Sequence, residues 1–206
     1  MKIAIVTGAS SGMGRETAVQ LADRFAGFGE IWLVARREER LSQLEEILPV
    51  PVRKFAIDLT DREQLAELET ALQNEQPDVK ILVNASGYGK MGRVGSVSTE
   101  EETGMVRLNC EALCAVTHMV LPYMSKNSRI IQYASSASFL PQPGFAIYAA
   151  TKSFVLSYSL ALGEELKAGE SALRPSAPVR LRPSFLTSLK LRGVFRFISV
   201  LQWRIR

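Results

Sequence analysis

A tyrosine and a lysine stand four residues apart in the segment YAATK, at Tyr148 and Lys152. On a helix this spacing places both side chains on one face, so the ammonium can lie beside the phenol. A neighbouring positive charge favours the ionised phenol, which suits the ring to general acid and base chemistry. The same pair is also typical of a half-buried aromatic beside a solvated amine, so it indicates chemistry only together with other residues.

Two further polar residues extend this candidate constellation. Ser135 follows an apolar run thirteen residues before Tyr148, where its hydroxyl could donate to an oxygen that gains charge during a reaction. Asn109, in VRLNCEA, is a second polar residue, on a predicted helix. Each has a plainer interpretation, since Ser135 has serine neighbours and Asn109 could be an ordinary polar residue on a helix face.

A glycine-rich turn follows the first apolar run directly, in the segment TGASSGMG. Glycines let the backbone turn tightly and approach a phosphate, and the free N–H groups at a helix start favour its negative charge. A tight strand-to-helix connection alone would need similar residues. The residues predicted to surround a pyrophosphate are Gly8, Ser10, Ser11, Gly12, Met13 and Gly14.

Alternating elements must position these residues. Short apolar runs too continuous to have a wet face alternate with amphipathic stretches, which specifies a parallel sheet covered on both sides. Right-handed crossovers then predict an α/β fold with a doubly wound, Rossmann-like parallel sheet. The strands are predicted at 2–7, 30–35, 52–58, 79–85 and 129–135, and the helices at 12–25, 38–48, 61–73, 100–124 and 146–167.

The order and spacing of these motifs resemble the short-chain dehydrogenase/reductase family. The glycines follow G-x-x-x-G-x-G, and Asn84-Ala85-Ser86-Gly87 stands where the family usually has Asn-Asn-Ala-Gly. The other matching positions are Asp58, Asn109, Ser135, Tyr148 and Lys152. The resemblance covers the chain from Met1 to about Lys167.

The resemblance implies reversible interconversion of a carbonyl and an alcohol by hydride transfer, on a small-molecule substrate that the sequence does not identify. Tyr148, Lys152, Ser135 and Asn109 would be catalytic. Asn109 would position a water that relays protons to Lys152, and Lys152 would also hold a ribose hydroxyl of the cofactor. The further cofactor-binding positions are Asp58 and Leu59 on the adenine side, with Asn84, Ala85 and Ser86. The family also packs its two later long helices across subunits, which implies a homo-oligomer.

The end of the second strand predicts the cofactor. An NAD-specific site offers an acid to the ribose hydroxyls there, whereas this chain has Ala35 followed by Arg36 and Arg37. Arginine can pair with a 2′-phosphate through charge-assisted hydrogen bonds, so NADP(H) is predicted over NAD(H). The alternative is that both arginines face solvent at a helix start.

Composition limits the remaining classes. The 206 residues, 47% of them hydrophobic, are enough for one domain with a sizeable core. The start of the chain has no predicted signal peptide or membrane span, which favours a cytoplasmic protein. Cys110 and Cys114 are more typical of two buried thiols than of a disulfide or a ligand pair, and no metal site is predicted.

The last part of the chain departs from this pattern. Residues 1–167, the predicted catalytic domain, carry a net charge of −3, whereas residues 168–206 carry +7. Prolines and arginines fill the place of an apolar sixth strand. A shifted reading frame of permitted codons from Ala168 to Lys190 can encode such a strand, a Pro-Gly turn and a Thr-containing loop. We therefore interpret 169–206 as the product of one missing nucleotide near Ala168.

Two other interpretations of the tail remain open. Ser188 to Arg206 mixes apolar and basic residues and could lie on an anionic membrane, while a nucleic-acid arm is less favoured because no base-reading motif accompanies the charge. The alternative function is a truncated, catalytically inactive product of this family whose basic amphipathic tail is inert or binds a membrane. On this basis the fifth strand is expected to keep an unpaired edge, unless Val179 and Leu181 pair as a substitute.

Overall fold

The computed structural model describes residues 1–24, 27–171 and 200–204. The chain divides into two compact units. The first comprises Met1–Gly87 and Glu111–Ser125, and the second comprises Tyr88–Cys110 and Lys126–Arg206. Each unit is built on its own strands and helices.

The first unit contains four parallel strands in the order β3-β2-β1-β4. Apart from its first residue, β1 is buried along its whole length, which is the pattern of a strand covered on both faces. The parallel arrangement confirms the prediction from the continuous apolar runs. The strands are β1 (Lys2–Thr7), β2 (Glu30–Val34), β3 (Val52–Phe55) and β4 (Asp78–Asn84).

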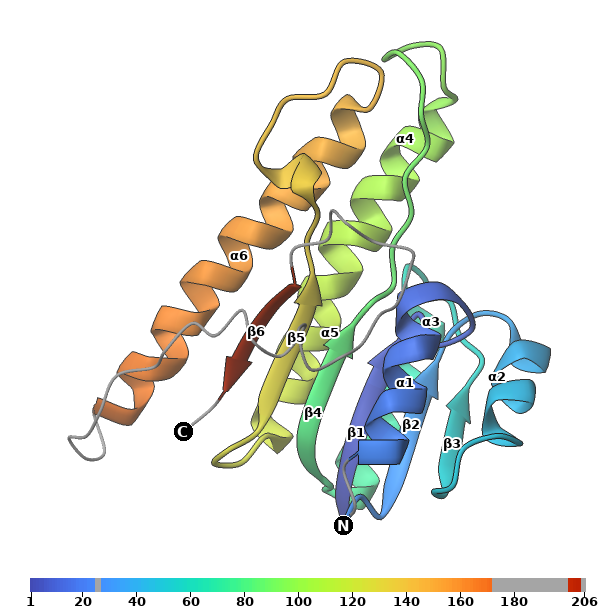
Figure 1. The fold of residues 1–206 in the computed structure, drawn as a ribbon, viewed down its shortest axis with the longest axis vertical. Helices are drawn as coiled ribbons and strands as arrows, with labels where there is room; N and C mark the ends of the chain where they lie inside the picture. Colours follow the sequence, from blue (N-terminus) through green and yellow to red (C-terminus); the bar gives the residue numbers. More distant parts are fainter. Residues whose placement is uncertain (25–26, 172–199, 205–206) are drawn as a thin grey trace. The chain divides into compact units, whose positions relative to one another are not determined.

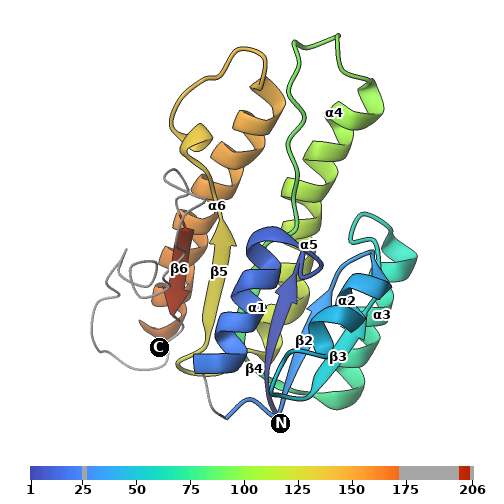
Figure 2. The same ribbon diagram turned by 45° about the vertical axis from the view of Figure 1, so that its right-hand side comes forward.

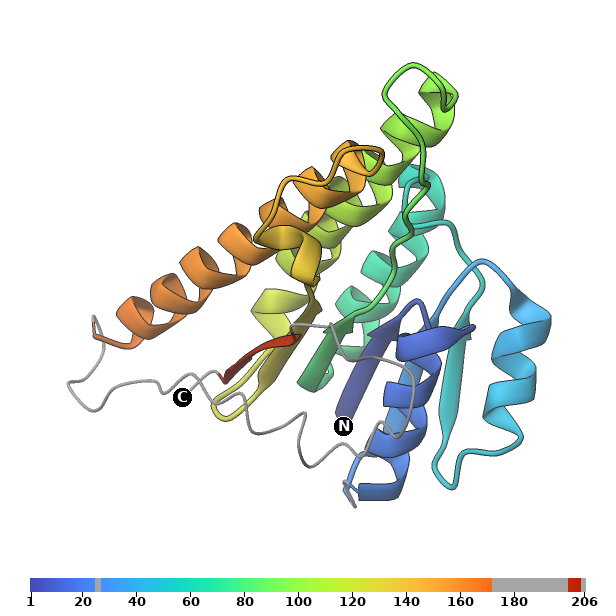
Figure 3. The same cartoon turned by 45° about the horizontal axis from the view of Figure 1, so that its top comes forward.

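Helices cover both faces of these strands, and in Figures 1 and 3 α1 lies in front of them and α3 behind. The side chain of Asp61 caps α3 by accepting from the backbone N–H groups of Glu63 and Gln64. The helix ends where Gln76 adopts a left-handed conformation. The helical segments of this unit are α1 (Gly12–Arg24), α2 (Glu38–Glu45), α3 (Arg62–Glu75), α5 (Ala112–Val120) and the 3₁₀ turn η2 (Leu121–Tyr123).

The second unit pairs a long helix with a short sheet, and Figure 2 shows β5 beside β6 with α6 along them. A 3₁₀ turn, η3, packs on the first turns of α6. The elements of this unit are α4 (Thr99–Val106), β5 (Arg129–Tyr133), η3 (Ser136–Ser138), α6 (Ala146–Ser171) and β6 (Val200–Arg204).

The helix predicted at 100–124 is not one α-helix. It consists of α4, the π-helical segment η1 (Arg107–Glu111), α5 and η2. Pro122 explains the last change, because a proline in the helix interior removes a backbone donor and clashes with the preceding turn. The π segment has no sequence signal as plain as a proline. It holds Asn109, and such segments are frequent at functional sites.

The edge of β5 is paired, so the expectation that it would lie unpaired is wrong. β6 runs antiparallel to β5, with Ile131 opposite Gln202. Antiparallel pairing through the backbone needs only an extended segment, which Val200–Arg204 provides. It does not need the apolar parallel strand that the sequence lacks. The proposed substitute at Val179 and Leu181 lies outside the described residues.

The two cysteines differ from the expectation of a buried pair. Cys110 is buried, but Cys114 is only half-buried, and neither forms a disulfide. Burial raises the pKa of the Cys114 thiol, so it stays protonated at neutral pH. Among the described residues no helix is long and apolar enough to cross a membrane.

Candidate active site

The glycine-rich turn between β1 and α1 has the conformation that only glycine adopts easily. Gly8 and Gly12 have φ angles of 66° and 57°. A Cβ atom on Gly8 would lie 2.6 Å from the backbone oxygen of Ala85, and one on Gly14 would meet the backbone oxygen of Gly8. Beside Gly12, in contrast, the space is open. The turn is therefore closely packed at Gly8 and Gly14 and open at Gly12, as a phosphate-binding turn requires.

Thr7, the last residue of β1, joins this turn to the end of β4. Its Oγ1 atom accepts hydrogen bonds from the backbone N–H groups of Ala85, at 3.1 Å, and Ser86, at 3.2 Å. Nearby, the buried side chain of Asn84 donates to Thr117 Oγ1 at 2.9 Å. The predicted cofactor residues Asn84, Ala85 and Ser86 are thus held in place, with Asn84 engaged inside the protein. Sequence analysis missed Thr7, whose only signal is its place at a strand end.

Arg37 lies over the serines of the glycine turn. Its guanidinium donates to Ser10 Oγ at 2.9 Å and to Ser11 Oγ at 2.8 Å. The residues are 27 and 26 positions apart in the chain, and the fold brings them together because β2 ends beside β1. One cation and two hydroxyls meet at this point, which is a suitable donor set for a phosphate monoester. Arg37 therefore does not simply face solvent.

Asp58 and Arg36 form a second polar contact after β3 and β2. Arg36 Nη1 lies 3.5 Å from Asp58 Oδ2, and the backbone N–H and hydroxyl of Thr60 both donate to Asp58 Oδ1. Burial alone would raise the pKa of the Asp58 carboxyl, but the hydrogen bonds from Thr60 and the charge of Arg36 outweigh it and lower the pKa. Asp58 is thus a carboxylate at neutral pH, and the adjacent Leu59 is buried.

Tyr148 and Lys152 occupy the first turns of α6, one turn apart as predicted. Lys152 Nζ lies 5.7 Å from the centroid of the Tyr148 ring. Its ammonium donates a hydrogen bond to the backbone oxygen of Tyr133 at 2.7 Å. Burial lowers the pKa of Lys152 from 10.5 to about 8, although Cys110 acts in the opposite direction. A buried amine with a pKa near neutrality can exchange protons at working pH.

Ser135 follows β5 and caps the turn η3. Its hydroxyl accepts from the backbone N–H of Ala137 at 3.2 Å, and its own N–H donates to Ser138 Oγ at 3.3 Å. Ser138 Oγ in turn donates to the backbone oxygen of Lys152 at 2.8 Å. The cap uses a lone pair of Ser135 and leaves its hydroxyl proton available for an oxygen. Ser138, by contrast, is committed to holding η3 on α6.

Asn109 is buried, and its amide links two segments. Nδ2 donates to the backbone oxygen of Tyr88 at 2.9 Å and to Thr151 Oγ1 at 3.0 Å, while Oδ1 accepts from the backbone N–H of Tyr88 at 3.0 Å. Both amide protons are therefore engaged, so a water bound by this side chain would have to donate to Oδ1. Thr151, another residue that sequence analysis missed, donates to the backbone oxygen of Tyr148 at 2.8 Å.

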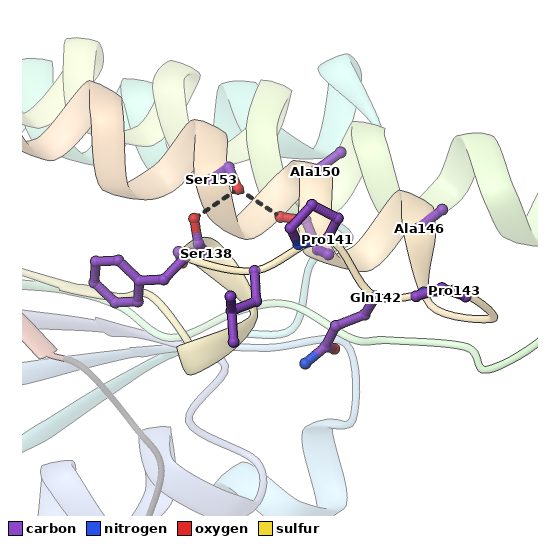
Figure 4. A pocket seen from close by; sticks show the side chains of 10 residues that line it. Ser138, Pro141, Gln142, Pro143, Ala146, Ala150 and Ser153 are labelled. Carbon is purple, nitrogen blue, oxygen red and sulfur yellow. Dashed lines mark hydrogen bonds between the residues drawn. The ribbon is translucent and has the colours of Figure 1, made fainter.

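A pocket of about 420 Å³ in the second unit lies beside α6 (Figure 4). Ser153 closes one side of it by hydrogen bonding to the backbone oxygens of Ser138 and Ala149, both at 3.0 Å. Four residues of α6 line it, namely Ala146, Ala149, Ala150 and Ser153. By helical periodicity this face is turned well away from the face that carries Tyr148 and Lys152. The pocket is therefore distinct from the tyrosine and lysine site. Among the residues described, no cluster of potential metal ligands occurs.

Comparison with known proteins shows the family to which the chain belongs. Residues 2–171 match the family model described as short chain dehydrogenase, and the chain belongs to this family. It is 37% identical over 172 residues to a very-long-chain 3-oxoacyl-CoA reductase of Laccaria bicolor, covering 80% of this chain and 50% of that protein. It is 31% identical over 167 residues to an uncharacterized oxidoreductase of Staphylococcus epidermidis, covering 80% of this chain and 71% of the relative.

Solved structures show the same fold. The bulky-bulky ketone specific alcohol dehydrogenase from Comamonas testosteroni matches with a TM-score of 0.71 and 32% identity, over 82% of this chain and 68% of that one. A short-chain dehydrogenase from Sphingobium yanoikuyae, solved in complex with NADPH, matches with a TM-score of 0.71 and 32% identity, over 82% and 67%. The predicted Rossmann-like α/β fold is thus confirmed. Half the length of the Laccaria protein has no counterpart here.

Proposed function

We propose that the protein is an NADP(H)-dependent oxidoreductase that interconverts a carbonyl and an alcohol. The observation that carries the choice of cofactor is the position of Arg37 against Ser10 and Ser11. A 2′-phosphate there would accept hydrogen bonds from one guanidinium and two hydroxyls. The acid that would select NAD is replaced by the buried, neutral Ala35.

The cofactor would supply the hydride donor or acceptor. Its pyrophosphate would bind at the turn of Gly8, Gly12 and Gly14, because the space beside Gly12 is open and α1 begins there. The adenine side would rest near Asp58 and Leu59. Asn84, Ala85 and Ser86 would contact the cofactor after β4, as the family pattern implies.

The chain's own residues would handle the proton. Tyr148 would give a proton to, or take one from, the substrate oxygen, and Ser135 would donate a hydrogen bond to that oxygen as it gains charge. Lys152 Nζ lies 5.7 Å from the centroid of the Tyr148 ring, and the lysine is itself partly neutral near pH 8. Asn109 would hold a water through Oδ1 and fix the backbone around Tyr148 through Thr151.

The test of this function compares binding of NADPH and NADH by the purified chain. We expect NADPH to bind at least about tenfold more tightly, and Arg37→Ala to weaken NADPH binding about 10- to 100-fold while NADH changes less than about twofold. Arg62→Ala is the control, because its exposed side chain makes only a loose 3.8 Å contact with Glu111. Tighter binding of NADH, or an equal loss for both cofactors, would overturn the assignment.

Reduction of a panel of aldehydes and ketones tests the reaction itself. Tyr148→Phe should remove turnover by about 100-fold or more, since it deletes the proton donor but keeps the ring. NADPH binding should change little. Turnover that survives in Tyr148→Phe would place the chemistry elsewhere.

We also propose that a lost base near the Ala168 codon explains the sequence after Lys167. The family match ends at residue 171, close to this point. A gene with one base restored should yield a chain with higher solubility and faster carbonyl reduction than the chain as written. Equal turnover from both would show that residues 169–206 form a working end and that the frameshift interpretation is wrong.

A homo-oligomer and a cytoplasmic location are part of the same proposal. The outer face of α6 exposes Leu160, a large apolar side chain that a second copy could cover. Elution as a dimer or larger species at micromolar concentration is the expected result. A strictly monomeric elution would contradict it.

A further inference from the structure

The ring of Tyr148 is packed against two residues that the proposed mechanism does not use. Phe145 stacks on it with a centroid distance of 4.3 Å and an angle of 22° between the ring planes. Gly89 lies against the edge of both rings. A Cβ atom built on Gly89 would be 2.7 Å from Tyr148 Cδ2 and 2.7 Å from Phe145 Cζ. The tyrosine ring therefore has a neighbour on one face and a backbone segment at its edge.

The Gly89 segment is exposed, but partly buried hydrogen bonds anchor it on both sides. Asn109, only 1% exposed, binds both the N–H and the carbonyl of Tyr88, the residue before Gly89. The N–H of Lys90, the residue after it, donates to Met105 Sδ at 3.3 Å. Because the residues on both sides of Gly89 are hydrogen-bonded, the backbone at Gly89 cannot easily move away from the ring. Gly89 therefore limits how far the ring can move in that direction.

The Phe145 side is anchored as well. The backbone oxygen of Phe145 accepts from the N–H of Ala149 at 2.9 Å, which joins it to the first turn of α6. The preceding residue, Gly144, accepts at its carbonyl from the N–H of Gly92 at 2.8 Å. The two segments that flank the tyrosine ring are therefore tied to each other, independently of the ring contacts.

We infer that Phe145 and Gly89 are positioning residues for the phenol of Tyr148, an inference that rests on the proposed function. Phe145 restrains the tilt of the ring, and Gly89 restrains its movement toward the loop. Lys152 Nζ lies 5.7 Å from the ring centroid. Proton transfer needs the phenol oxygen to be held within about 0.5 Å of its productive position. Misplacement by about 1 Å can lower a rate about 100-fold.

A second aromatic pair, within α6, provides a matched control. Phe154 and Tyr158 also stack, with centroids 6.0 Å apart and planes at 9°, two turns farther along α6. Phe154→Leu removes the same ring from a phenylalanine–tyrosine pair without touching Tyr148. Any general effect of losing a stacked ring on this helix is therefore measured by that variant.

The experiment compares Phe145→Leu, Phe145→Tyr, Gly89→Ala and Phe154→Leu in the full chain. We expect Phe145→Leu and Gly89→Ala to lower kcat for ketone reduction about 10- to 100-fold, with KM and the Kd of NADPH changed less than about threefold. Phe145→Tyr keeps a ring and should retain kcat within about threefold, as should Phe154→Leu. A loss that appears in KM alone, or equally in Phe154→Leu, would overturn the inference.

Ring dynamics test the restraint without turnover. In protein labelled with ¹³C at the tyrosine ε positions, Tyr148 is identified by its absence from Tyr148→Phe. We expect separate or broadened signals from the two ring edges, which merge into one sharp signal in Phe145→Leu but not in Phe154→Leu. A single sharp signal in the unaltered chain would disprove the restraint. If the chain shows no turnover but the ring is restrained, the proposed function fails and the positioning geometry stands.

Discussion

The ammonium of Lys152 donates a hydrogen bond to the backbone oxygen of Tyr133 at 2.7 Å, which ties α6 to the last residue of β5. The side chain is 8% exposed, so the charged form has lost most of its water. One carbonyl replaces only part of that hydration. The bond therefore fixes the position of the amine without supplying a full counter-charge, which is why burial lowers the pKa to about 8.

This lowered pKa predicts the pH dependence of stability. Between pH 8 and 10.5 an unfolded lysine holds a proton that the folded one has lost, so this group's contribution to the free energy of unfolding rises with pH in that window. Lys152→Met lacks the contribution. Relative to the variant, the natural chain should gain up to about 3 kcal/mol between pH 8 and 10.5.

Urea unfolding of both chains at a series of pH values measures the difference. All other groups are common to the two, so the difference isolates Lys152. A difference that stays constant from pH 7 to 10.5 would show that the lysine has an ordinary pKa in the folded chain.

Two glycines of the phosphate turn should respond differently to the same substitution. Both have positive φ, which costs alanine about 1 kcal/mol. Gly8→Ala also drives a methyl group into the backbone of Ala85, whereas Gly12→Ala meets nothing within 4 Å. Gly8→Ala should therefore be less stable than Gly12→Ala by at least about 2 kcal/mol.

Thermal unfolding of the two variants, side by side, gives the comparison. Gly12→Ala should instead act mainly on NADPH binding, because its methyl group points into the open side of the turn. Equal stability of the two variants would mean that the contact between Gly8 and Ala85 is not close.

The strands and the tyrosine–lysine pair were predictable because their signals are local. Continuous apolar runs identify β1 and β4, and a spacing of four places Tyr148 and Lys152 on one face. Thr7 was not predictable, since its partner Ala85 is 78 residues away and a lone threonine has no pattern. The arginine at 37 was predicted to bind a phosphate, but its contacts with two serines needed the packing of β2 on β1.

The π-helical segment η1 could not be predicted from the sequence. Helical periodicity predicts a helix but does not distinguish an α-helical turn from a π-helical turn, which contains one more residue. What marks the segment is the buried amide of Asn109, whose partners Tyr88 and Thr151 are 21 and 42 residues away. The tail is a different case, because a strand can pair through its backbone with little demand on sequence.

Asn109→Asp should test how much the hydrogen bonds of the Asn109 amide contribute to stability. A carboxylate still accepts from Tyr88 N–H but cannot donate to Tyr88 oxygen or to Thr151 Oγ1, and it places a charge in a buried site. We expect a loss of about 3 kcal/mol or more in stability. Asn74→Asp, on the exposed face of α3, is the control and should cost less than about 1 kcal/mol.

Amide exchange at Tyr88 provides the local readout. The Tyr88 N–H should exchange faster in Asn109→Asp than global unfolding explains. The variant loses the hydrogen bond from the Asn109 amide to the Tyr88 carbonyl, so only the bond from the Tyr88 N–H holds the loop. Unchanged exchange and stability would mean that the hydrogen bonds of Asn109 contribute nothing to holding the loop.

Proline substitutions in β6 should test whether the end of the chain protects β5. In an antiparallel pair, neighbouring residues alternate in pointing their N–H toward the partner strand, so of Leu201 and Gln202 only one donates to β5. Proline removes one ladder bond, worth about 1 kcal/mol, at the donating position and none at the other. We therefore expect Leu201→Pro and Gln202→Pro to differ, with one lowering the melting temperature and increasing aggregation as the β5 edge opens. Light scattering at micromolar concentration beside thermal unfolding measures both effects, and each variant is the control for the other. If neither variant differs from the natural chain, the pairing of β5 with β6 adds no stability, and the edge must be protected in another way.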